Sequence, residues 1–296
     1  MKKTITLAKH AGFCYGVKRA VETTKKLIIE NPIRPVCVLG ELIHNSDVIG
    51  ELDNIGISTV EKIADLNCST KDCGVCVIRS HGLAQTEINK ISEKGYEIVD
   101  LTCIDVKKVQ QKAVELAKDS ALVIIVGKSE HPEVMAIYAN AKDVSDDVFV
   151  VSSVDEIDEA LKNQIKLAKY VGVVSQTTQK VKNLQAIVSE LLLYTKDLRV
   201  FNTICPSTTK RQTEACELAK NSDLMIVVGS KKSANTTHLA ELLTQITETI
   251  HIENEKELDN YIDVVGKSSK IGITAGASTP QNIIEAVINK LENHNS

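Results

Sequence analysis

The 296-residue sequence contains no tryptophan, and aromatic residues make up only 3% of it. Proteins that bind single-stranded nucleic acid need aromatic side chains on which the bases stack, so this composition argues against that class. A basic excess is also missing, because 35 Lys and Arg stand against 39 Asp and Glu, a formal net charge of -4. Nucleic-acid-binding domains are usually basic, and we therefore expect no nucleic-acid partner.

Long apolar runs are absent as well. No segment approaches the roughly 20 apolar residues that span a bilayer, and the first ten residues contain no sustained apolar stretch. We expect no membrane partner, no signal peptide and a cytoplasmic location. Because thiols stay reduced there, the eight cysteines are interpreted as metal ligands, nucleophiles or core residues rather than as four disulfides.

Short apolar runs that end in glycine or a polar loop alternate with amphipathic stretches along the whole chain. This pattern is typical of buried parallel strands connected by helices, and it predicts an α/β fold. The expected strands are 36–39, 122–126, 171–174, 224–228 and 271–274.

Three cysteines, Cys14, Cys103 and Cys205, each follow a strand-like run and precede a basic, amphipathic helix. A helix N-terminus stabilises a thiolate through its dipole and its free N–H groups. The Lys and Arg residues that follow, Arg211 among them, are expected on the solvated helix faces. Three convergent thiolates suit an iron–sulfur cluster whose fourth iron has no protein ligand. We therefore predict these cysteines as metal ligands.

Each cysteine is accompanied by two polar loops that follow strands. The first loops read His44-Asn45-Ser46, His131-Pro132-Glu133 and Ser233-Ala234-Asn235. The second loops read Ser80-His81-Gly82, Ser175-Gln176-Thr177-Thr178 and Gly276-Ala277-Ser278. In open α/β sheets, ligands bind at the carboxyl ends of the strands, where these loops lie.

The repeat predicts three pseudo-threefold-related α/β units with parallel sheets around a central iron–sulfur cavity. The expected units are residues 15–103, 104–200 and 201–296, the last completed by an N-terminal strand within 1–14. The alternative is that the repeat reflects only generic βαβ units, whose cysteines and loops do not share a common centre.

Other interpretations compete at single residues. Cys68, Cys73 and Cys76 have a C-x4-C-x2-C spacing that resembles part of a ferredoxin run. Cys37 and Cys216 are expected to be buried structural thiols. Glu133 alone would be a surface acid at a helix start, and the two histidines, His44 and His81, could be structural. The residues Ser233, Asn235 and Ser278 could be plain N-caps.

The ordered set of motifs resembles 4-hydroxy-3-methylbut-2-enyl diphosphate reductase (the IspH/LytB family) from about residue 5 to about residue 290. The segments concerned are Gly12-Phe13-Cys14-Tyr15-Gly16-Val17, Gly40-Glu41-Leu42-Ile43-His44-Asn45, Ser80-His81-Gly82, His131-Pro132-Glu133-Val134, Ser175-Gln176-Thr177-Thr178, Thr203-Ile204-Cys205 and Val228-Gly229-Ser230-Lys231.

The resemblance implies the threefold α/β arrangement and a [4Fe–4S] cluster on three cysteines. It also implies the last step of the non-mevalonate isoprenoid pathway. In that step, two electrons and two protons remove the hydroxyl of an allylic diphosphate as water, giving isopentenyl and dimethylallyl diphosphates. An external one-electron donor such as ferredoxin or flavodoxin is implied.

Carried over by motif, the resemblance makes Cys14, Cys103 and Cys205 the cluster ligands. It makes Glu133 the proton donor, assisted by His131 and Thr177, which also contact the substrate. The diphosphate site then consists of His44, His81, Ser233, Ala234, Asn235 and Ser278.

Three departures from the family pattern stand out: Ile104 replaces a proline, Ala234 replaces a serine, and the C-terminus is shorter. Two other functions stay open. One is a threefold iron–sulfur enzyme of the quinolinate synthase kind, and the other is a non-catalytic metal- or diphosphate-binding module.

Overall fold

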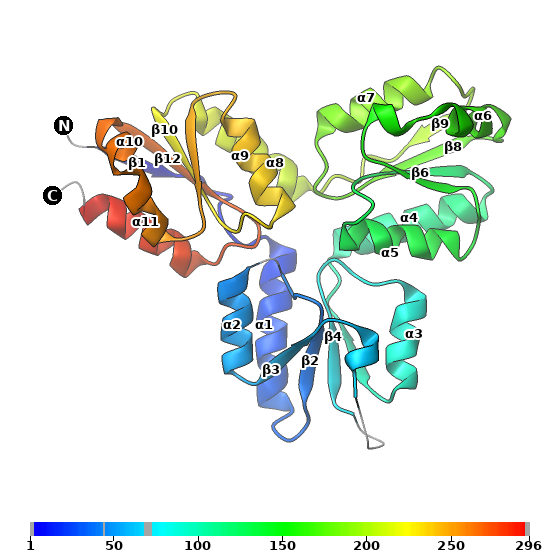
Figure 1. Cartoon of the computed structure of the whole chain (residues 1–296), viewed down its shortest axis with the longest axis horizontal. Helices are drawn as coiled ribbons and strands as arrows, with labels where there is room; N and C mark the ends of the chain where they lie inside the picture. The colour runs from blue at the N-terminus through cyan, green and yellow to red at the C-terminus, as the bar shows by residue number, and fades with distance from the viewer. Residues whose placement is uncertain (1–2, 44, 68–72, 294–296) are drawn as a thin grey trace. The chain divides into compact units, whose positions relative to one another are not determined.

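The structure is a computed structural model that describes residues 3–43, 45–67 and 73–293. It contains three four-stranded sheets in which all paired strands run parallel, with helices connecting successive strands (Figure 1). The α/β class and the three repeated units are therefore confirmed. Within these ranges, no helix has the length and apolar character needed to cross a membrane.

The first sheet has the strand order β3-β2-β4-β5. Its strands are β2 (Val36–Leu39), β3 (Ile57–Val60), β4 (Val75–Ile78) and β5 (Glu97–Asp100). Helices α1 (Tyr15–Glu30), α2 (Ser46–Asn54), η1 (Ile63–Asp65) and α3 (Gln85–Glu93) belong to the same stretch of chain. Alternate residues of β2 and β4, among them Leu39 and Ile78, pack with Ile91 of α3 in one core cluster.

The second sheet has the order β7-β6-β8-β9. Its strands are β6 (Leu122–Val126), β7 (Val148–Val151), β8 (Val171–Ser175) and β9 (Leu198–Val200). Its helices are α4 (Ile104–Lys118), α5 (Pro132–Lys142), η2 (Val154–Glu156), α6 (Glu159–Leu167) and α7 (Val181–Leu191).

The β6 strand is buried on both faces. Val123 and Ile125 pack against α4 and α5, whereas Ile124 and Val126 pack against α6 and α7 (Figure 1). A parallel strand covered on both faces needs apolar residues at every position, which explains the unbroken run 122–126.

The third sheet has the order β1-β12-β10-β11. Its strands are β1 (Thr4–Leu7), β10 (Leu224–Val228), β11 (Glu248–Ile252) and β12 (Lys270–Ala275). Its helices are α8 (Pro206–Ala219), α9 (Ala234–Leu243), η3 (Glu255–Tyr261), α10 (Ile262–Lys267) and α11 (Gln281–Asn293). The first strand of the chain pairs with the last, so that Thr4 lies opposite Lys270.

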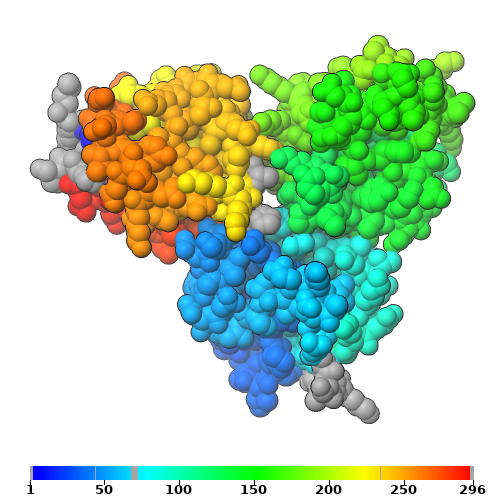
Figure 2. Space-filling view, viewed as in Figure 1, coloured from blue at the N-terminus to red at the C-terminus, as the bar shows by residue number. Residues whose placement is uncertain are grey.

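The chain divides into two compact units. The terminal unit comprises Met1–Glu22, Ile43–Ile55 and Pro206–Ser296 and holds the third sheet, and the central unit comprises Thr23–Leu42 and Gly56–Cys205 and holds the other two. Figure 2 shows one face of the same structure with the side chains drawn in full, coloured by residue number. The boundaries expected at 103/104 and 200/201 remain predictions.

Candidate active site

Each cysteine predicted as a metal ligand lies immediately before the first residue of a helix. The helices are α1 after Cys14, α4 after Cys103 and α8 after Cys205. None of the three is in a disulfide, and all three are of intermediate exposure. This is the position at which the helix dipole favours a thiolate.

One backbone contact recurs at all three cysteines. In each case the cysteine N–H donates to a carbonyl in a loop that the sequence predicted as a second polar loop. The pairs are Cys14 with Ala277 (3.3 Å), Cys103 with Ser80 (3.0 Å) and Cys205 with Thr177 (2.8 Å). Each predicted ligand is thus fixed beside a loop that contains a predicted substrate residue.

A side-chain contact inside the central unit links Cys205 to the first turn of α4. The Cys205 Sγ lies 3.2 Å from Oδ2 of Asp105, in the first turn of α4 after Cys103. Sequence reasoning missed Asp105, for which the only signal was its place two residues after a predicted ligand.

Convergence of all three thiols remains a prediction, because Cys14 belongs to the terminal unit and the other two to the central unit. Among the residues that the structure describes, no three His, Cys, Asp or Glu side chains are gathered as a metal ion would require.

The competing cysteine trio is not a set of free thiols. Cys73 is disulfide-bonded, so the expectation that the cysteines are unlinked is wrong at this residue. Cys76 is fully buried in β4, in register with Cys37 of β2, and Cys68 lies outside the described residues. Cys37 is buried as expected, whereas Cys216 is partly exposed rather than buried.

The His131-Pro132-Glu133 motif forms the start of α5. His131 is the N-cap, and its Nδ1 accepts the Glu133 N–H at 3.2 Å, while Pro132 occupies the first helical position. The Glu133 side chain points inward and is only 1% exposed. The alternative of a solvated surface acid is therefore wrong.

Thr177 binds both oxygens of the Glu133 carboxylate. The Thr177 backbone N–H donates to Oε1 at 2.6 Å, and its hydroxyl donates to Oε2 at 2.8 Å. Burial raises the pKa of Glu133 to about 7, although both hydrogen bonds lower it. A carboxyl that titrates near neutral pH is suited to proton transfer.

The two described histidines of the predicted site lie together. The rings of His81 and His131 meet edge to face, with 5.4 Å between centroids. The central unit therefore brings together His81, His131, Glu133 and Thr177, next to the loop that accepts the Cys205 N–H.

The terminal unit contains the other predicted substrate residues. Ser233 is the N-cap residue of α9, yet its side chain makes no capping hydrogen bond, so the plain N-cap interpretation is wrong for it. Asn235 lies in the first turn of α9, and both side chains are buried. Ser278, in the loop after β12, is 7% exposed, and its buried Oγ has no hydrogen-bond partner among the described residues. Such hydroxyls at a helix N-terminus suit an anionic ligand.

The loops after β10 and β12 pack closely in this unit. A Cβ at Gly276 would collide with the Thr236 hydroxyl of α9, and one at Gly229 would collide with Thr279. These glycines allow the two loops to meet at the α9 N-terminus. Of the remaining predicted residues, Ala234 is the first residue of α9, and His44 lies outside the described residues.

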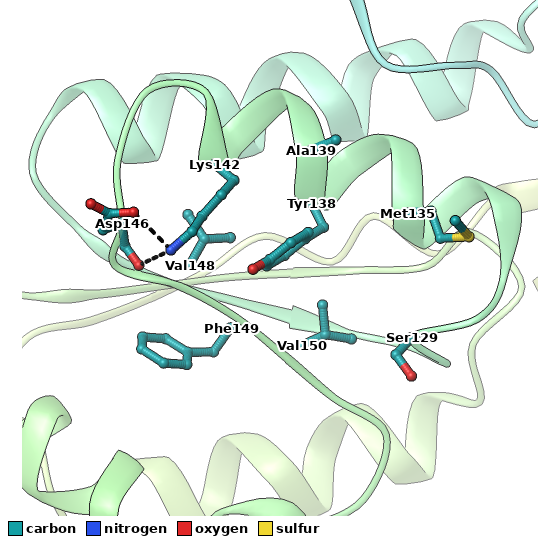
Figure 3. Close-up of a pocket in the computed structure, with 9 residues that line it drawn as sticks. All are labelled: Ser129, Met135, Tyr138, Ala139, Lys142, Asp146, Val148, Phe149 and Val150. Carbon is teal, nitrogen blue, oxygen red and sulfur yellow. Dashed lines mark hydrogen bonds and ion pairs between the residues drawn. The ribbon is translucent and has the colours of Figure 1, made fainter. Parts of the chain in front are cut away.

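A separate cavity of about 570 Å³ lies along α5 and β7 (Figure 3). Apolar side chains such as Met135, Tyr138 and Phe149 line it, together with the Lys142–Asp146 ion pair (3.0 Å). No predicted site residue lines this cavity, so it is distinct from the candidate active site.

Comparison with known proteins identifies the family. The model of the family described as LytB protein matches residues 5–292. A 4-hydroxy-3-methylbut-2-enyl diphosphate reductase of Clostridium tetani is 41% identical over 99% of this chain, which spans 44% of that longer protein. A reductase of the same name from Syntrophotalea carbinolica is 40% identical over 97% of this chain and 98% of its own length.

Two solved structures share the fold. One is described as (E)-4-hydroxy-3-methyl-but-2-enyl diphosphate reductase, the terminal enzyme of the non-mevalonate pathway; it has a TM-score of 0.73 at 33% identity and covers 98% of this chain and 99% of its own. The other is an E-1-hydroxy-2-methyl-but-2-enyl-4-diphosphate reductase from Plasmodium falciparum, with a TM-score of 0.86 at 26% identity. The match covers 98% of this chain and 88% of the Plasmodium falciparum chain. The resemblance stated from the motifs is thereby confirmed, and this chain belongs to the LytB protein family.

Proposed function

We propose that this chain is an enzyme that reduces (E)-4-hydroxy-3-methylbut-2-enyl diphosphate to isopentenyl and dimethylallyl diphosphates, the last step of the non-mevalonate pathway. The reaction consumes two electrons and two protons, breaks the allylic C–O bond and releases the hydroxyl as water. The observation that carries this proposal is the buried Glu133 carboxyl, held by Thr177 and titrating near neutral pH.

The metal ligands proposed for this reaction are Cys14, Cys103 and Cys205, around one [4Fe–4S] cluster with an open iron, in a cavity shared by the three α/β units. The donor set fits, because all three are cysteines outside disulfides that directly precede helices and share one type of backbone contact. When bound, such a cluster supplies electrons and a Lewis-acidic iron.

The diphosphate is proposed to bind at the α9 N-terminus. Its oxygens would accept hydrogen bonds from Ser233, Asn235 and the unpartnered hydroxyl of Ser278, with His81 contributing from the first sheet. His44 and Ala234 complete the proposed set. Amides at a helix start already favour negative charge, so this site needs no excess of basic side chains.

Glu133 is proposed to deliver the proton to the departing hydroxyl oxygen. Its burial excludes bulk water and keeps the acid form populated near pH 7. Thr177 holds both carboxylate oxygens, and His131 fixes the backbone at Glu133. The electrons would come from an external one-electron donor such as ferredoxin or flavodoxin, in the cytoplasm, where the cluster thiols stay reduced.

Anaerobic purification with iron and sulfide analysis, followed by assay with the allylic diphosphate and a strong artificial one-electron donor, tests the proposal. The expected result is about four irons and four sulfides per chain and formation of both products. A cluster-loaded protein that binds the diphosphate without turnover would be a binding module. A cluster-loaded protein that neither binds nor reduces it would point to another iron–sulfur enzyme.

A further inference from the structure

The connection that ends in Cys14 is the longest of the three that lead to a predicted ligand. Residues 8–14 join β1 to α1, whereas 101–103 join β5 to α4 and 201–205 join β9 to α8. Side chains close in the sequence hold the two shorter connections: Asp100, the last residue of β5, accepts the Thr102 N–H at 2.9 Å, and Asn202 accepts the Ile204 N–H at 3.2 Å. In the third connection the Ala11 N–H donates to the Ala8 carbonyl at 3.2 Å, and residues 9–12 are also bound by side chains of a remote helix.

Arg211 of α8 binds two carbonyls of this connection. Its Nε donates to the His10 carbonyl at 2.9 Å, and its Nη2 donates to the Gly12 carbonyl at 2.7 Å. The expectation that Arg211 lies on a solvated helix face is wrong, because it is only 3% exposed. Gly12 has φ +85°, and a Cβ there would press on Ile284, so the turn before Cys14 requires glycine.

Glu214, one turn further along α8, binds the amide groups of the same segment. Its carboxylate accepts the Lys9 N–H at 2.6 Å, the His10 N–H at 2.9 Å and the His10 ring Nδ1 at 2.7 Å. Burial alone would raise the pKa of Glu214, but the hydrogen bonds from His10 and Lys9 outweigh it and leave that pKa below its usual range.

One face of α8 therefore binds both carbonyl groups and N–H groups of the backbone in residues 9–12. Residues three apart on a helix point to the same side, so Arg211 and Glu214 act on one segment together. The segment ends two residues before Cys14, whose own N–H donates to Ala277. Arg211 and Glu214 thus make five hydrogen bonds to the segment that leads to Cys14. The Cys14 N–H itself donates one backbone hydrogen bond.

We propose that Arg211 and Glu214 are positioning residues for the metal ligand Cys14, fixing residues 9–12 so that the thiol is presented correctly for cluster assembly. The inference rests on the proposed cluster. It makes the binding of metal at Cys14 depend on α8, the helix that directly follows Cys205 in the chain.

The test uses the full-length chain with Arg211→Met, Arg211→Lys, Glu214→Ala and Glu214→Gln. Glu217→Ala is the matched control, since Glu217 is an exposed acid on the same helix. Two measurements need no metal: hydrogen exchange of the Lys9 and His10 amides, and the rates at which iodoacetamide alkylates Cys14, Cys103 and Cys205. A third follows loss of the reconstituted iron–sulfur chromophore to a chelator.

Glu214→Ala should speed exchange at Lys9 and His10 by about tenfold or more, because hydrogen bonds to a charged group are lost. Alkylation should accelerate selectively at Cys14, and the chromophore should be lost several-fold faster. Arg211→Lys and Glu214→Gln, which keep part of the contacts, should be intermediate. If Arg211→Met does not fold, Glu214→Ala still decides, because that carboxylate is partly exposed.

Unchanged exchange and alkylation relative to Glu217→Ala would overturn the inference, as would equal acceleration at all three cysteines, which marks general destabilisation. A wild-type chain that assembles no cluster would refute the proposed function. The metal-free exchange and alkylation results would then still show whether α8 fixes the Cys14 segment, so the two failures are distinguishable.

Discussion

Thr177 binds both oxygens of the Glu133 carboxylate, one through its backbone N–H and one through its hydroxyl. The carboxyl group would otherwise be an unpaired acid inside the protein, with a pKa higher still. Burial and these two donors act in opposite directions, and together they leave the pKa at about 7. The loop after β8 thus sets the protonation of a group on α5.

Replacing Glu133 with Gln should abolish most turnover while leaving the cluster spectrum and diphosphate binding intact. Glutamine matches the shape and accepts the Thr177 N–H, but it cannot deliver a proton. We expect kcat to fall by about 100-fold or more, measured with an artificial one-electron donor. Wild-type kcat in the variant would remove Glu133 as the proton donor.

The same variant should be more stable than the wild type at alkaline pH. The folded-state pKa of about 7 exceeds the ordinary 4.5. Below pH 4.5 the carboxyl is therefore protonated in both the folded and the unfolded state, and its burial costs the wild type no stability through ionisation. The wild type then loses stability as the pH rises to 7, and the loss stays constant above that. The difference of 2.5 between these two pKa values corresponds to a loss of stability on the order of 3 kcal/mol. Thermal unfolding of both proteins from pH 4.5 to 8.5 checks this, and parallel Tm curves would contradict it.

Thr177→Val should move the alkaline limb of the pH–rate profile to higher pH. The Thr177 hydroxyl lowers the pKa of Glu133, so its loss raises that pKa and keeps the acid form to higher pH, by about half a pH unit to one unit. Thr178→Val is the control, since its hydroxyl accepts from Gln176 Nε2 at 2.9 Å. An identical shift in both variants would argue against the specific role of Thr177.

Ser278→Ala should weaken substrate binding without weakening the fold. The Ser278 Oγ is buried and has no hydrogen-bond partner in residues 3–43, 45–67 and 73–293, so its removal loses no hydrogen bond within that part of the chain. We expect KM to rise by about 5- to 100-fold at unchanged or higher Tm. Ser268→Ala is the converse control, because its Oγ donates to the Val264 carbonyl at 2.8 Å: it should lower Tm and spare KM.

Serine at Cys14, Cys103 or Cys205 should each lower the iron content of anaerobically reconstituted protein far below that of the wild type. Cys216→Ser, on α8, should retain the full content, because that thiol is not a proposed ligand. Iron and sulfide analysis with electron paramagnetic resonance of the reduced protein measures both. Full iron content in any of the three ligand variants would remove that cysteine from the set.

The apolar runs in the sequence were sufficient to predict the bounds of strands that are buried on both faces. Strands β2, β6 and β10 begin and end where the apolar runs do, because continuous burial leaves an uninterrupted signal. The positions of Pro132 and Pro206 likewise mark the first residues of α5 and α8, whereas α11 begins one residue after Pro280. Local steric preference fixes such helix starts only to within about a residue or two.

The site residues could be predicted from the sequence wherever a motif contained them, but the residues that contact them in the structure could not. No local pattern shows that Arg211 turns inward to the carbonyls before Cys14, or that Asp105 meets Cys205, since both contacts join residues a hundred or more positions apart. The disulfide at Cys73 was missed for a different reason. Disulfides were excluded because a reducing compartment was expected, and that expectation contains no information about which cysteines lie close together.

Pairing of β1 with β12 also has a consequence for synthesis on the ribosome. The opening strand lies at the edge of its sheet and pairs with β12, where Thr4 faces Lys270, so its partner strand becomes available only after β12 has been synthesised. The segment before Cys14 is likewise without its hydrogen-bond donors and acceptors until α8 has been translated. If Cys14 binds the proposed cluster, its segment can be fixed for that role only after α8 (Pro206–Ala219) has been synthesised, and a chain truncated before α8 should be unable to retain iron there.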